Sequence, residues 1–225
     1  MKKGGKIALG AVAVLAVAGV AVAAWQWNNL NALRYGLTLS QADIDEKLAE
    51  NEQTLTGAME EYHVRSYEFS EEELRQLDEG TLSVADAAKK LIDGDVPAAE
   101  APDVQTGAQA QSDLDAQIQE QIAQMYVLRS TYIAKLESIA QAAIDEYTQG
   151  EHTDENKADV VYKRVEELTD LEADCDAQVA DVVARLRELL QQAGRDDSLA
   201  RQVEKTYQEE KSLKKAAYLE QFRNG

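Results

Sequence analysis

The strongest constraint on the fold is a long helical periodicity in the second half of the chain. From Leu114 to Tyr147, apolar side chains recur every three to four residues, which places them along one face of a helix. After Gly150 and a short polar turn, a second run follows heptad spacing from Val161, with a shorter helical run after Gly194. Two long runs joined by a short turn predict an antiparallel, coiled-coil-like hairpin followed by a shorter third helix.

Small and aliphatic side chains form the predicted seam of the second long helix, with Glu172 as the one charged exception. Since a single Cys cannot form an internal disulfide and a buried Cys packs as a small hydrophobe, we interpret Cys175 as a packing residue. Heptad seams also pair between chains, so self-assembly is an alternative to an intramolecular hairpin. The predicted seam residues are Val161, Val165, Leu168, Cys175, Val179, Val182, Leu186 and Leu189.

An uncharged segment near the N-terminus sets the expected location of the chain. The run from Ile7 to Trp25 has no charged side chain, and as a helix it approaches the roughly 30 Å hydrocarbon core of a bilayer. We therefore predict a single-pass transmembrane signal-anchor at 7–27, a cytoplasmic N-terminus and an extracytoplasmic bulk on the cell membrane. The flanking residues that support this are the interface tryptophans Trp25 and Trp27 and the basic Lys2, Lys3 and Lys6.

The same segment also fits a cleavable signal peptide. Ala21 and Ala23 match the small-x-small pattern that precedes a cleavage site, here before Ala24. Cleavage would yield a secreted helical protein. We favour a retained anchor because the apolar run continues through this site to Trp25.

Helix start signals organise the next part of the chain. Ser40, Ser70 and Ser83 are each followed three residues later by an acidic residue, which is typical of a capped helix N-terminus. Both prolines fall between residues 95 and 111, where Ala and Gln are common and no large aromatic occurs. This composition is typical of a linker.

The sequence therefore predicts an all-α chain in five consecutive parts. They are a basic cytoplasmic tip (1–6), a transmembrane helix (7–27), a small membrane-proximal helical region (28–94), a linker (95–111) and the helical hairpin domain (112–225).

Composition excludes several functions. With 23 basic and 42 acidic residues, the net charge of −19 opposes nucleic-acid binding. One Cys and two His are too few for a soft-ligand metal cage, and no nucleotide-binding or nucleophile motif is present. We expect no cofactor, no small-molecule substrate and no enzymatic activity.

The remaining hypothesis is a scaffold or interaction protein whose partner is another envelope protein or a second copy. The one basic cluster comprises Lys211, Lys214 and Lys215. We interpret it as a solvated helix face that pairs with the acidic hairpin, and a docking surface for an acidic partner is the alternative.

The fate of the N-terminal segment is directly measurable. We expect the mature protein to keep residues 7–27 and to stay with the membrane after alkaline washing, because the apolar helix is held by the bilayer. N-terminal sequencing of the purified protein checks this. A mature chain that begins at Ala24 would establish the secreted alternative.

Overall fold

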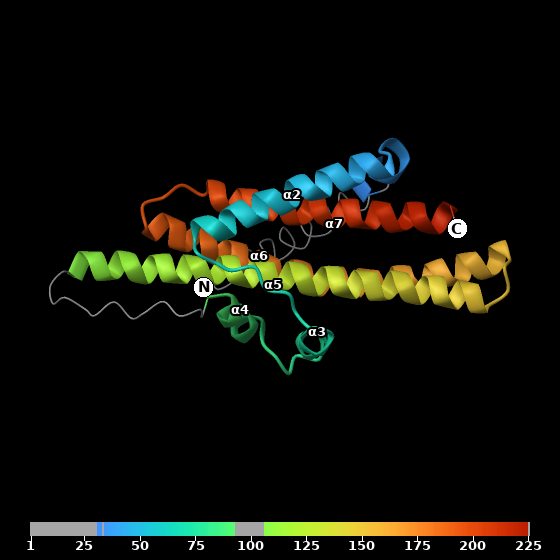
Figure 1. Ribbon diagram of the computed structural model, residues 1–225, viewed down its shortest axis with the longest axis horizontal. Helices are drawn as coiled ribbons and strands as arrows, with labels where there is room; N and C mark the ends of the chain where they lie inside the picture. The colour runs from blue at the N-terminus through green and yellow to red at the C-terminus, as the bar shows by residue number, and fades with distance from the viewer. Residues whose placement is uncertain (1–30, 33, 93–105, 225) are drawn as a thin grey trace, which may run out of the picture. The chain divides into compact units, whose positions relative to one another are not determined.

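The described part of the chain is helical and contains no strand, which confirms the all-α prediction (Figure 1). The computed structural model describes residues 31–92 apart from 33, and residues 106–224. None of the helices in these residues has the length and apolar character that a membrane span requires. The predicted anchor at 7–27, with its flanking tryptophans and lysines, lies outside the described residues.

After a helical stretch within residues 31–38, six helices follow in the described ranges. They are α2 (Gln41–Glu61), α3 (Glu71–Asp78), α4 (Val84–Ile92), α5 (Thr106–Gln149), α6 (Asp154–Gln192) and α7 (Ser198–Asn224). The first of the two long helices, α5, begins at Thr106, inside the segment 95–111 that the composition assigned to a linker.

The expected start signals operate at all three serines. Ser70 forms a complete capping box at α3, because its hydroxyl accepts from the Glu73 N–H while the Glu73 carboxylate accepts from the Ser70 N–H. At α2 and α4, the hydroxyls of Ser40 and Ser83 accept from the backbone N–H three residues later. These side chains satisfy N–H groups that have no partner inside the helix.

The described residues fall into two compact units, one within residues 31–48 and 208–224 and the other within residues 49–92 and 106–207. In the first unit, Ile44 from the start of α2 is buried with Leu213 and Ala216 from the second half of α7. Lys47 and Glu209 add an ion pair at 4.0 Å. This unit brings together the start of α2 and the second half of α7, which lie far apart in the sequence.

In the second unit, α5 and α6 run side by side in opposite directions (Figure 1). Side-chain bonds between them fall in reversed order along the two helices, as an antiparallel pair requires. From the turn toward the other end of the hairpin, these bonds join Glu146 to Lys163, Tyr132 to Glu172, and Gln117 to Arg185.

The core of the second unit lies away from the turn between α5 and α6. Ile118, Ile122 and Leu128 of α5 are buried in one cluster with Val182 and Leu186 of α6. Residues from the end of α2, from α4 and from the start of α7 join this cluster, so the hairpin is covered by neighbouring helices here. Burial of these aliphatic side chains is the main favourable term for this unit.

The polar loop between α2 and α3 is held by a charged network. Glu73 accepts hydrogen bonds from Lys90 of α4 at 2.6 Å and from the Tyr67 hydroxyl at 2.7 Å. The Lys90 ammonium, the Ser70 backbone N–H and the Tyr67 hydroxyl together lower the pKa of the Glu73 carboxyl to about 2. The network ties α3, α4 and the loop together.

The predicted seam of α6 departs from the structure at Val165, which is 51% exposed. The buried positions nearest the turn are instead Val160 and Leu171, eleven residues apart, and Arg164 reaches α5 to pair with Glu146. A strict heptad drifts by about 20° per repeat against a straight helix, so the buried stripe shifts by one position. The side chain of Val161 lies outside the described part.

This correction predicts different effects for two residues assigned to the same seam. Leu186→Ala should reduce the free energy of unfolding by about 2–5 kcal/mol, because Leu186 is fully buried. Val165→Ala should change it by less than about 0.5 kcal/mol, because its side chain is already half in solvent. Chemical unfolding of the full-length chain in detergent measures both, and equal losses would restore the predicted seam.

Candidate functional site

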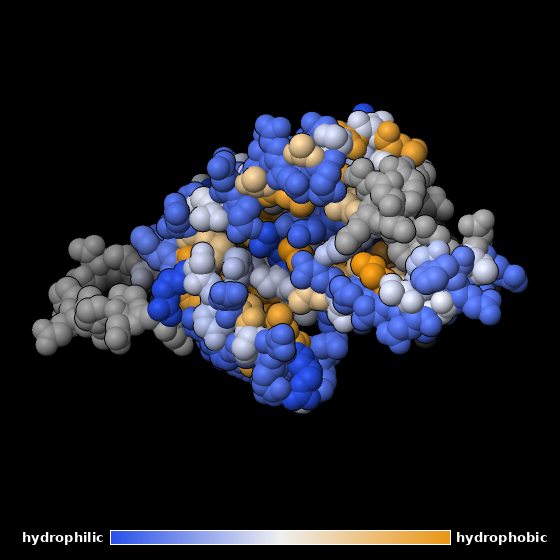
Figure 2. All heavy atoms as spheres, turned by 45° about the vertical axis from the view of Figure 1, so that its right-hand side comes forward, coloured by the Kyte–Doolittle hydropathy of each residue, from blue (hydrophilic) through white to orange (hydrophobic). Residues whose placement is uncertain are grey.

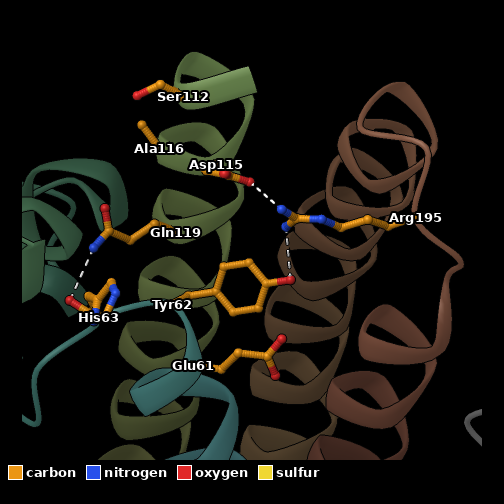
Figure 3. Close-up of a pocket in the computed structure, with 8 residues that line it drawn as sticks. All are labelled: Glu61, Tyr62, His63, Ser112, Asp115, Ala116, Gln119 and Arg195. Carbon is orange, nitrogen blue, oxygen red and sulfur yellow. Dashed lines mark hydrogen bonds and ion pairs between the residues drawn. The ribbon is translucent and has the colours of Figure 1, made fainter. Parts of the chain in front are cut away.

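A polar groove lies in the second unit where three segments meet (Figure 3). It encloses about 600 Å³. The end of α2 and the turn after it form one wall, the first part of α5 forms another, and the turn between α6 and α7 completes it. The lining residues are Glu61, Tyr62, His63, Ser112, Asp115, Ala116, Gln119 and Arg195.

Arg195 joins the walls of this groove. Its guanidinium donates to the Asp115 carboxylate at 2.7 Å and to the Tyr62 hydroxyl at 3.2 Å, and it lies 5.8 Å from the centre of the Tyr62 ring. On the opposite side, the Gln119 amide donates to the His63 carbonyl at 3.0 Å (Figure 3). Most polar groups of the groove are therefore hydrogen-bonded to one another, and these bonds connect the three segments that line it.

His63 is the unusual residue of the groove. Three helices, α2, α3 and α6, end in the same pair of backbone hydrogen bonds. The second residue after the helix donates to the carbonyl three residues earlier, and the residue that follows it donates to the carbonyl five residues earlier. In each case the second residue after the helix adopts a left-handed conformation. At α3 and α6 this residue is Gly80 or Gly194, with φ of 70° and 68°. At α2 it is His63, with φ of 55°, although its Cβ disfavours this conformation.

His63 is exposed and lies in the turn after α2. Its special backbone position was missed. The signal that identifies it is the absence of glycine just after α2, where the other two helices carry Gly80 and Gly194.

A second cluster of polar groups is buried between the helices of this unit. The Tyr132 hydroxyl donates to Glu172 at 3.3 Å and the Tyr207 hydroxyl to Asp176 at 3.2 Å, while the two rings meet edge to face at 6.1 Å. Burial raises the pKa of both phenols well above the usual value, so they stay protonated and act as donors. Cys175 is a free, buried thiol in the same region, as the packing interpretation requires.

Glu172, the one charged position of the predicted seam, is 1% exposed. A buried carboxylate costs free energy unless polar partners compensate it, and the Tyr132 hydroxyl supplies one such bond. Polar residues at seam positions are known to select one pairing of two helices over others. The cluster therefore favours one alignment of α5 and α6.

Outside the core, α6 exposes large apolar side chains. Tyr162 is 77% exposed, and Val165 follows it one turn later on the same helix. The next turn carries Thr169, whose hydroxyl donates to the Val165 carbonyl at 2.8 Å and is thus satisfied within the helix. Figure 2 shows a mostly hydrophilic face with hydrophobic side chains in small areas. Among the described residues, the exposed large hydrophobic side chains are Leu37, Tyr162 and Val165.

Comparisons with known proteins supply no function. No protein-family model, no curated protein and no solved structure matches the chain. A function is therefore inferred from the geometry of the described residues. Within them, no group of three or more His, Cys, Asp or Glu side chains is arranged to hold a metal ion.

The predicted docking lysines do not form an open basic surface. Lys211 and Lys215 are buried, and Lys214 is half-buried. Burial of a lysine costs free energy unless polar partners compensate it. The two buried lysines therefore do not belong to a solvated helix face. Of the predicted seam, Cys175, Val179, Val182, Leu186 and Leu189 are buried and Leu168 is half-buried.

Relief of the left-handed conformation at His63 should be measurable. His63→Gly should raise the free energy of unfolding by about 0.5 kcal/mol, because glycine adopts this φ without a Cβ clash. Gly194→Ala is the matched control, because no atom lies within 4 Å of the added Cβ and only backbone strain acts. This variant should lower the free energy of unfolding by about 1 kcal/mol. Chemical unfolding compares the two. A stability loss in both variants would show that the His63 imidazole makes contacts worth more than the strain.

Proposed function

We propose that the chain is a non-catalytic helical scaffold that presents the outer face of α6 to a protein partner. The observation that carries the proposal is the 77% exposed Tyr162 beside the half-exposed Val165, on a helix whose opposite side pairs with α5 through Arg164. Tyrosine is enriched in protein interfaces because it combines a large apolar ring with a hydrogen-bonding hydroxyl.

The support beneath this face is well suited to presentation. Lys163 and Arg164, on the same turn as Tyr162, both pair with Glu146 of α5, and Arg164 also pairs with Glu167 at 2.8 Å. The two bonds to Glu146 attach the helix to its antiparallel partner next to the exposed ring. An anchor on a supported helix loses less conformational entropy on binding than one on a free loop.

The location of this scaffold is proposed from the sequence. Residues 7–27 would hold it in the cell membrane with the helical part outside the cytoplasm. Cleavage before Ala24 would leave the same helices as a secreted interaction protein.

Self-assembly through the heptad seam has less support. Val179, Val182 and Leu186 already pack in the core of their own unit, so this part of the seam is occupied within one chain. Self-assembly through this seam would require these intramolecular contacts to be broken, whereas binding of a protein partner to the outer face of α6 would not.

Site-specific photocrosslinking in the native membrane tests the proposal. A photoreactive amino acid at position 162 of the full-length chain should give a discrete protein adduct, because this side chain lies at the proposed contact. Position 180 is the control, since Ala180 is exposed on the same face about five turns further along α6. Equal adducts at both positions, or no adduct at 162, would contradict the proposal.

A further inference from the structure

Acidic side chains lie beside the exposed apolar residues on the surface of α6. Asp159 precedes Tyr162 by three residues and Glu166 follows it by four, so both are its direct neighbours on the helix surface. Glu155 and Asp170 continue this acidic line by one turn in each direction. All four carboxylates are exposed. The outer face of this part of α6 therefore carries a short apolar line, Tyr162 and Val165, beside an acidic line.

The acidic line is not neutralised by the described part of the chain. None of its four carboxylates forms an ion pair or side-chain hydrogen bond with a described residue, whereas neighbouring charges of α6 do. Lys163 pairs with Glu146 at 3.0 Å, and Arg164 pairs with Glu146 and Glu167. The nearest described cations of α6 are thus already used for the contact with α5.

These charges restrict what can cover the face. A second copy docked through the same face would place acidic line against acidic line, which is unfavourable. An anionic lipid surface or a nucleic acid would meet the same repulsion. A basic partner interacts favourably with both lines, because its Lys or Arg side chains can form ion pairs with the carboxylates and can lie over the Tyr162 ring.

We propose that the outer face of α6 binds a basic amphipathic helix of its partner, an inference that rests on the proposed scaffold function. The two lines run along α6 with the spacing of successive helical turns, which matches apolar and basic residues at i, i+3, i+4 and i+7 of a docked helix. Apolar side chains of that helix cover Tyr162 and Val165, and its basic side chains pair with Asp159 and Glu166. The contact is small, so its affinity is in the micromolar range.

Binding of two synthetic peptides to the full-length chain in neutral detergent tests this inference. The probe is a fluorescent amphipathic peptide of about 20 residues with leucines on one face and lysines beside them, and its control has glutamates in place of the lysines. Fluorescence anisotropy should show micromolar binding of the lysine peptide and none of the glutamate peptide.

Variants on α6 localise that binding. Asp159→Lys with Glu166→Lys, and separately Tyr162→Ser, should each weaken binding at least about tenfold, because they remove the charge pairs or the apolar anchor. Asp174→Lys with Asp181→Lys makes the same change in net charge at other exposed positions of α6 and should alter binding by less than about twofold.

Equal weakening by the two charge-reversed variants would overturn the inference, because the peptide would then be responding to net charge alone. Absence of binding by the lysine peptide, or an unchanged affinity for Tyr162→Ser, would also overturn it. The photocrosslinking result is separate. A discrete adduct at position 162 together with any of these outcomes would leave the scaffold function in place and reject only the basic helix as its partner.

Discussion

The structure of the second unit depends on the apolar packing of α5 against α6 within a single chain. Ile118, Ile122, Val182 and Leu186 supply this contact, and the end of α2, α4 and the start of α7 are added to it. The four-residue segment between the long helices makes the pairing local in sequence, so little chain entropy is lost in forming it. The pairing also positions both candidate surfaces, because the groove at Arg195 lies at one end of it and Tyr162 lies toward the other.

The long helices, their turn and the serine caps were predictable because each depends on local rules of spacing and hydrogen bonding. The exact buried face of α6 near the turn was not, since heptad spacing alone does not say whether a helix supercoils, and Arg164 rather than Val165 faces α5 there. The packing of the start of α2 against the second half of α7, around Ile44 and Leu213, was also beyond prediction, because contacts distant in sequence leave no local pattern.

The candidate site was likewise predictable only where it depends on local sequence. The lysine cluster was conspicuous in composition, yet Lys211 and Lys215 are buried, because their exposure is decided by tertiary packing. Tyr162 was not singled out, although it lies one position after the predicted seam residue Val161. Its exposure is evident only in the structure, where the side chain is 77% accessible to solvent. The positive φ of His63 becomes notable only beside those of Gly80 and Gly194.

The uneven burial along the hairpin has a consequence for its motion. Between residues 137 and 170, the buried apolar residues among the described side chains are Ala143 and Val160, whereas the other half of the hairpin holds most of the core. Local opening costs least free energy where few apolar contacts are lost, so backbone amides near the turn should exchange with solvent before those around Leu186. The face that carries Tyr162 therefore belongs to the more easily opened half of the hairpin. A partner bound there would slow amide exchange in this half, and the hairpin would transmit binding as a change in order while the packed end kept its structure.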